Sequence, residues 1–161
     1  MKKTVFLCLV IFLMQISLFA LEKEYGPKDS KKKILLAYEK TTFKERFINA
    51  LVKSLNDEKT YIKIVEHTKN KKNNELDSED PTKYTAVFIT NSGVGSRIRP
   101  WVNAWLKQFE ENNKNILLHT TKEKEWQTNV KVDSISSASF VTQIKSLVAE
   151  VTAKINKIAS N

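Results

Sequence analysis

The sequence predicts a single α/β domain with an open, mostly parallel sheet flanked by helices. Three short apolar runs carry this prediction, because each ends abruptly in a polar loop: Ile34–Tyr38, Tyr84–Thr90 and Ile116–Thr120. Amphipathic helical patterns follow the first two loops. Strand, loop and helix in this order are typical of an open sheet whose binding crevice lies beyond the carboxyl ends of its strands. Function is therefore expected in loops 39–42, 91–99 and 121–129.

The first 20 residues have the pattern of a secretory signal peptide. Lys2 and Lys3 precede an uncharged apolar stretch that ends at the small residue Ala20. This stretch, Thr4–Ala20, has 17 residues, which is at the short limit for a membrane span of about 20 residues. Export with cleavage is the favoured interpretation, and an uncleaved membrane anchor is the alternative. In either case we expect a periplasmic or other extracytoplasmic protein.

Composition restricts the chemistry of the chain after residue 20. In this part we expect a linker at residues 21–33 and one domain at residues 34–161. Its lack of cysteine excludes thiolate nucleophiles, disulfides and iron–sulfur ligation. Without Lys2 and Lys3, 25 of the 27 Lys and Arg residues remain against 18 Asp and Glu, a net charge of +7. This charge fits an anionic envelope surface as a partner, whereas the even scatter of lysine favours simple solubilisation. Nucleic acid is not an expected partner, because basic and aromatic residues do not alternate.

Apolar periodicity places the individual elements. Continuous apolar runs, as expected for strands covered on both faces, predict strands at 34–38, 61–65, 85–89 and 115–119. Helical spacing predicts helices over about 42–56, 98–109 and 140–158. Pro100 suits the first turn of the second helix, and Trp101 and Trp105 lie on its apolar stripe, so both are expected in the core.

Two regions are less regular. Residues 67–83 are polar and predict a loop or a poor helix. Val130–Val132 is expected to be the last strand, but only about nine residues separate it from the strand before it, whereas a parallel crossover usually needs a dozen or more. Its direction, parallel or antiparallel, is left open.

No catalytic or metal-binding motif accompanies this architecture. His67 lies just after the second predicted strand and His119 lies in the fourth, and neither has acidic residues near it at metal-ligand spacing. The sequence has no Gly-x-Ser-x-Gly elbow. Gly93 and Gly95 lack the third glycine of a dinucleotide-binding turn and do not follow the first strand. The strand ends also lack the acidic cluster of a magnesium-dependent phosphoacceptor domain.

The order of elements resembles the flavodoxin-like family over nearly all of residues 34–161. The shared pattern is a lysine-preceded first strand, a loop, a helix, and a third strand that runs into residues 91–101, Asn-Ser-Gly-Val-Gly-Ser-Arg-Ile-Arg-Pro-Trp. The resemblance implies bound FMN and electron transfer to an unidentified redox partner protein. In that family the loops after the third and fourth strands sandwich the flavin ring. The flavin contacts so implied are Asn91, Ser92, Gly93, Thr121 and, as the stacking aromatic, Trp126.

The loop after the first strand departs from the family pattern. Residues 39–44 read Glu-Lys-Thr-Thr-Phe-Lys and contain no glycine, whereas the family loop wraps a phosphate with amides and hydroxyls. Thr41 and Thr42 retain hydroxyls for this purpose, but Glu39 repels a dianion. The alternative is that Thr41 or Thr42 simply caps the helix. A flavin-free domain that binds a ligand or a protein is therefore the second functional hypothesis.

Residues 133–139, Asp-Ser-Ile-Ser-Ser-Ala-Ser, resemble the flavinylation motif of exported FMN-binding domains. The resemblance implies that Ser139 receives FMN through a phosphoester bond and that Asp133 is the leading acid of the motif. A covalent tether would make a poor phosphate loop tolerable. The alternative is that Ser136, Ser137 or Ser139 caps the last helix, with Asp133 near its positive end.

Overall fold

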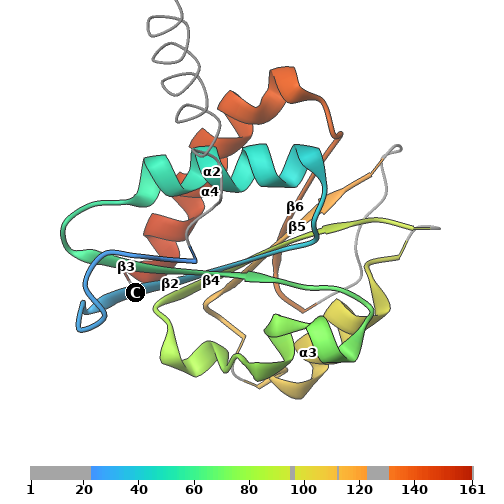
Figure 1. Cartoon of the computed structure of the whole chain (residues 1–161), viewed down its shortest axis with the longest axis horizontal. Helices are drawn as coiled ribbons and strands as arrows, with labels where there is room; N and C mark the ends of the chain where they lie inside the picture. The colour runs from blue at the N-terminus through green and yellow to red at the C-terminus, as the bar shows by residue number, and fades with distance from the viewer. Residues whose placement is uncertain (1–22, 95–96, 112, 123–130, 161) are drawn as a thin grey trace, which may run out of the picture.

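The computed structural model describes residues 23–94, 97–111, 113–122 and 131–160 (Figure 1). Its strands are β1 (Glu24–Tyr25), β2 (Lys32–Tyr38), β3 (Thr60–Glu66), β4 (Ala86–Ser92), β5 (Ile116–Thr121) and β6 (Asp133–Ser137). Its α-helices are α2 (Thr42–Leu55), α3 (Pro100–Gln108) and α4 (Ile144–Ala159). Within the described ranges, no helix is both long enough and apolar enough to cross a membrane.

The strands form one sheet in the order β1-β3-β2-β4-β5-β6. Among the described strands, only the pairing of β1 with β3 is antiparallel, and the other four pairings are parallel. The predicted α/β class with a mostly parallel sheet is confirmed. From β2 the chain proceeds to β3 on one side and then to β4 on the other. The carboxyl ends of β2 and β4 therefore flank the topological switch point, where open α/β sheets bind ligands.

Helices cover both faces of the sheet (Figure 1), and an apolar core lies between the sheet and the helices on each face. On one face α2 and α4 lie side by side and bury Phe47 and Val151 against strand residues such as Phe88. On the other face α3 buries Trp105, and the half-buried Trp101 packs against the same core. The helical periodicity therefore predicted the core-facing sides of these helices correctly.

The last strand lies at a different position from the predicted one. Its direction, which the sequence left open, is parallel. β6 occupies Asp133–Ser137 rather than residues 130–132, and it runs parallel to β5, with His119 opposite Ile135. Ile135 is the buried residue of this strand. The serines on either side of it suggested a helix cap in the sequence, but pairing with β5 and burial of Ile135 make the segment a strand.

The last helix consequently begins later than predicted. α4 starts at Ile144, after a short 3-10 turn at Val141–Gln143, and its capping residue is Gln143, which makes no side-chain capping hydrogen bond. The prediction that Ser136, Ser137 or Ser139 caps this helix is wrong. Asp133 does not lie at the positive end of α4 either, because it pairs with Lys154 at 3.0 Å in the second half of that helix.

Two segments outside the main elements also acquire structure. Residues 24–25, within the expected linker, form β1 beside β3. Residues 67–83 contain three short 3-10 helices, at Lys71–Asn73, Glu75–Ser78 and Pro81–Lys83. Leu76, in the second of them, is fully buried in the core on the α3 side. Pro81, in the third of them, is also buried, and the carbonyl of Glu79 accepts a hydrogen bond from Nε1 of Trp105 at 3.2 Å, so both apolar and polar contacts hold this segment against the domain.

Candidate functional site

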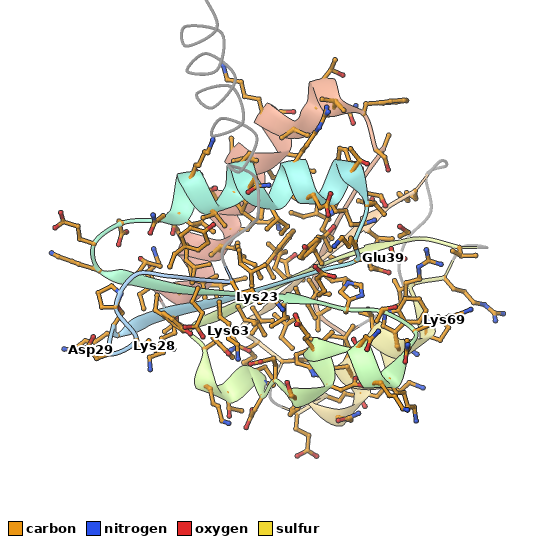
Figure 2. The ribbon with its side chains drawn as sticks, viewed as in Figure 1. Lys23, Lys28, Asp29, Glu39, Lys63 and Lys69 are labelled. Atoms are coloured by element: carbon orange, nitrogen blue, oxygen red, sulfur yellow. The ribbon has the colours of Figure 1, made fainter. Side chains whose placement is uncertain are left out.

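Residues from the loop after β2, from β4 and from the start of α3 contact one another at the topological switch point. Glu39 is the first residue after β2, at the end of the sheet from which α2 starts (Figure 2). Its Oε2 accepts a hydrogen bond from the backbone N–H of Ser92 at 3.0 Å, and its Oε1 lies 2.6 Å from Nη2 of Arg99. Its own N–H donates to the carbonyl of Thr90 at 3.2 Å. Glu39 thus ties the loop after β2 to β4 and to the start of α3.

A buried lysine completes this group. Lys44 lies in the first turn of α2, and its side chain is only 2% exposed. Its Nζ donates to Oγ of Ser92 at 2.7 Å and lies 3.4 Å from Oε2 of Glu39. Lysine is almost never fully buried unless it is paired. We call Glu39, Lys44, Ser92 and Arg99 the Glu39 cluster.

Arg99 reaches the cluster from the N-cap position of α3. Its backbone N–H donates to Oδ1 of Asn91 at 3.0 Å, and its guanidinium lies 5.4 Å from the centre of the Trp101 ring. Nε of Arg99 is buried, and no hydrogen-bond partner for it is found among the described residues. The cluster therefore holds two cationic side chains around one carboxylate.

Burial and charge act in opposite directions on the acid of the cluster. Burial by itself would raise the pKa of Glu39, but hydrogen bonds from Ser92 and Arg99 and the charge of Lys44 hold it below its ordinary value. Burial lowers the pKa of Lys44, and the nearby Glu39 carboxylate opposes that shift. The carboxylate of Glu39 therefore stabilises the charged form of Lys44, which burial removes from solvent.

A second set of buried, hydrogen-bonded polar residues lies at the same end of the sheet and carries no net charge. Nε2 of His67 lies 2.9 Å from the carbonyl oxygen of Thr90, and Nδ1 of His67 accepts a hydrogen bond from Nε1 of Trp101 at 3.0 Å. Nδ1 of His119 lies 2.8 Å from Oγ1 of Thr90, and Nε2 of His119 lies 2.9 Å from Oγ of Ser137. We call these five residues the histidine chain.

The hydrogen bonds assign a neutral tautomer to each histidine. The indole of Trp101 only donates, so Nδ1 of His67 is the acceptor and Nε2–H donates to Thr90. The Ser137 hydroxyl donates to the carbonyl of Ala138 at 3.1 Å, so it accepts from Nε2–H of His119. Burial is the largest cause that lowers the pKa of His67 to about 4 and that of His119 to about 3.

The structure brings four of the predicted flavin contacts together at the ends of β4 and β5. Asn91 is fully buried, and its amide nitrogen donates to the carbonyl of His119 and to Oγ1 of Thr120, both at 3.1 Å. The N–H of Gly93 donates to the carbonyl of Thr121 at 2.7 Å, and the Thr121 hydroxyl donates to the carbonyl of Asn91 at 3.3 Å. Ser92, the fourth of these contacts, belongs to the Glu39 cluster.

The other predicted site residues lie apart from this group. Oγ1 of Thr41 accepts a hydrogen bond from the N–H of Lys44 at 3.3 Å, which confirms the helix-cap alternative for Thr41. Thr42 is exposed at the first position of α2. Ser139 is exposed in the irregular segment after β6. Trp126 lies outside the described residues.

Sequence reasoning missed Lys44 and did not place Arg99 in the site. The signal for Lys44 was present, since residue 44 lies on the apolar stripe of α2, three and seven residues before Phe47 and Leu51. A lysine on a core-facing stripe requires a buried partner. Arg99 gave no comparable signal, because basic residues at the surface of a basic protein are usually solvated.

The residues around the loop after β2 do not fit a flavin phosphate. The carboxylate of Glu39 lies in the crevice and already accepts hydrogen bonds from Ser92 and Arg99. The hydroxyl of Thr41 is engaged as a helix cap. The loop has no glycine that would let backbone amides approach a phosphate closely. Among the described residues, no three or more His, Cys, Asp or Glu side chains lie together in an arrangement suited to a metal ion.

Comparison with known proteins identifies the fold but no family by sequence. No protein-family model matches the chain, and no curated protein matches it. The flavodiiron core of Flv1 from Synechocystis superposes with a TM-score of 0.52 at 7% identity, over 83% of this chain and 37% of that one. The flavo di-iron protein of Thermotoga maritima gives 0.49 at 11% identity, over 78% and 36% of the two chains. An archaeal flavodoxin gives 0.47 at 9% identity, over 78% and 98%.

The fold is flavodoxin-like. The order β3-β2-β4-β5-β6 is the 2-1-3-4-5 strand order of that fold, with β1 added at one edge. The chain spans a little over a third of the length of the flavodiiron proteins that it resembles. Since identity is this low, the likeness concerns the fold, and function must be argued from the site.

Proposed function

We propose that this chain is an exported flavodoxin-fold binding module that works without resident FMN. The supporting observation is the position of the Glu39 carboxylate, which lies in the switch-point crevice between Ser92 and Arg99. A phosphate brought to the loop after β2 would have to compete with this carboxylate for the hydrogen bonds of Ser92 and Arg99. The chain therefore has the flavodoxin-like fold, but we propose that a ligand other than FMN binds in the crevice at the carboxyl ends of its strands.

The module is proposed to bind its ligand or partner protein at the carboxyl edge of the sheet. The loops after β2 and β4 meet at that edge through Glu39, Ser92 and Arg99. Exposed apolar side chains also follow the strands there, namely Val94 after β4 and Phe140 and Val141 after β6, and Phe140 is 63% exposed. Export is proposed from the sequence of residues 1–20 alone.

The test is the colour and the flavin affinity of the exported protein. The full chain is expressed with its signal and recovered from the extracytoplasmic space, and an authentic flavodoxin serves as the positive control. We expect a protein without visible flavin absorbance that leaves the fluorescence of added FMN unchanged. Saturable quenching of FMN fluorescence would refute a flavin-free module. N-terminal sequencing is expected to begin at Leu21, and an intact N-terminus would indicate a membrane anchor instead.

A second candidate is an electron carrier in the cell envelope with FMN tethered to Ser139. The observation that favours it is the exposure of Ser139 outside any regular element, since a phosphoester at that residue would not depend on the crevice beside Glu39. Flavin absorbance that survives denaturation and disappears in Ser139→Ala would establish this candidate. Ser136→Ala is the matched control, because Ser136 is an exposed serine of the same motif. A colourless wild-type protein from its native compartment would eliminate it.

A further inference from the structure

The Glu39 cluster has more hydrogen-bond donors than one carboxylate can satisfy. Lysine supplies three N–H donors and arginine five. The structure gives Lys44 two partners, Oγ of Ser92 and Oε2 of Glu39. Nε of Arg99 is buried without a partner in the part of the chain that the structure describes. The backbone N–H of Ser92 adds a further donor aimed at Glu39. Three donors, from β4, α2 and the start of α3, converge on the two carboxylate oxygens of Glu39: the backbone N–H of Ser92, Nζ of Lys44 and Nη2 of Arg99.

The charge of the cluster is unbalanced in the same direction. Two cationic side chains, Lys44 at 2% and Arg99 at 26% side-chain exposure, share the single carboxylate of Glu39. A buried cation is costly unless an anion and hydrogen-bond acceptors accompany it. Convergent donors and excess positive charge are the features of a site for an oxyanion, and here a carboxylate of the chain supplies the oxygens.

We propose that the Glu39 cluster is a self-occupied oxyanion site, and that the ligand of this module carries a carboxylate or phosphate group that replaces the carboxylate of Glu39. This inference rests on the proposed function, because it concerns the same crevice. The side chain of Glu39 can turn out of the cluster, since Glu39 lies in the loop at the carboxyl end of β2 and 14% of its side chain is exposed. Lys44 and Ser92 are held by α2 and β4 and would remain in place.

Self-occupation makes binding competitive. A ligand anion and the Glu39 carboxylate cannot accept the same hydrogen bonds, so the ligand binds only the fraction of molecules in which Glu39 has turned away. The apparent dissociation constant is raised by the inverse of that fraction. Removal of the Glu39 charge should therefore increase affinity for a small oxyanion, whereas loss of an ordinary structural acid would not.

The experiment measures the effect of inorganic phosphate on thermal unfolding, with chloride at equal ionic strength as the reference and acetate as the carboxylate probe. Glu39→Gln keeps the size of the side chain and removes its charge. We expect its melting temperature to rise saturably with phosphate, with an apparent dissociation constant lower than that of the wild type by about tenfold or more. A larger response to phosphate than to acetate would identify a phosphate-type ligand, and the reverse a carboxylate.

Two further variants make the result specific. Glu66→Gln is the matched control, because Glu66 ends the neighbouring strand β3 and pairs with Tyr38 and Lys40 outside the cluster. It should respond to phosphate as the wild type does. The double variant Glu39→Gln/Lys44→Met should lose the response, because the buried cation is removed.

Each outcome decides the inference. If Glu39→Gln folds only when phosphate is present, that rescue counts as the expected binding. No saturable effect of either anion on Glu39→Gln, or a response that persists without Lys44, would overturn the inference and leave the flavin-free module standing. FMN binding by the wild-type protein would instead overturn the proposed function, whatever phosphate does.

Discussion

The Glu39 cluster and the histidine chain bury polar groups at the same end of the same sheet in opposite ways. In the Glu39 cluster, Lys44 and Arg99 remain close to one ionised acid, which compensates part of their charge. In the histidine chain, both rings are neutral, and every ring nitrogen has a hydrogen-bond partner. The comparison shows that a buried polar group is stabilised either by a partner of opposite charge or by loss of its own charge. The first arrangement is sensitive to removal of a partner, and the second to acid.

Acid should have the largest effect, and it should act through the histidine chain. The folded-state pKa values of His67 and His119, about 4 and about 3, lie below the ordinary value of 6.5. The unfolded chain therefore binds more protons in this range, so the stability from neutral burial is complete above pH 6.5 and falls as the pH approaches 4. Near pH 4.5 we expect a loss of about 2 kcal/mol per histidine, measured by urea unfolding at pH 7 and pH 4.5.

A variant of one histidine sharpens this prediction. His67→Gln keeps one donor and one acceptor for Thr90 and Trp101 but cannot titrate in this range. Its unfolding free energy should depend less steeply on pH than that of the wild type. An unchanged pH dependence would mean that His67 is not buried in its neutral form.

Loss of the central acid should be the next largest effect. Glu39→Leu leaves two cations close together with their acceptor removed, and it should lower the unfolding free energy by about 3 kcal/mol, less than for a fully buried pair because Arg99 is partly exposed. Urea unfolding at pH 7 measures the loss. Glu66→Leu, which removes a half-exposed acid from a neighbouring strand, should cost less than about 1 kcal/mol. Equal losses in the two variants would contradict a special role for Glu39.

Removal of a cation should be milder than removal of the acid. In Lys44→Met the carboxylate of Glu39 keeps its hydrogen bonds from Ser92 and Arg99, so we expect a loss of about 1–2 kcal/mol, mainly from the unpaired Ser92 hydroxyl. The same unfolding assay measures this loss. A larger loss in Lys44→Met than in Glu39→Leu would show that Lys44 acts through packing rather than through charge.

The smallest effect concerns the cap that positions Lys44. Thr41→Ala removes the side-chain oxygen that accepts from the N–H of Lys44 and should cost about 1 kcal/mol. Thr42→Ala is the matched control, because Thr42 is exposed and makes no cap, and it should change stability by only a few tenths of a kcal/mol. If Thr42→Ala is the more destabilising change, the assignment of Thr41 as the cap is wrong.

Local patterns predicted most of the fold, and they failed where pairing between distant segments was decisive. The strands around Leu36, Ile64, Phe88 and Leu117 were evident from continuous apolar runs, since both faces of a parallel strand are covered. The segment around Ile135 was not, because one buried residue among serines fits a helix cap as well as an edge strand. Only its register with β5 distinguishes the two.

The sequence by itself determined the α/β class, the core-facing sides of the helices, and the carboxyl edge as the place to search for a site. These follow from local periodicity, which a linear pattern records. Only the tertiary structure decided that Glu39, Lys44, Ser92 and Arg99 form one cluster and that both histidines are buried as neutral rings. The physical reason is that burial and charge compensation depend on distances between residues as many as 60 positions apart in the chain.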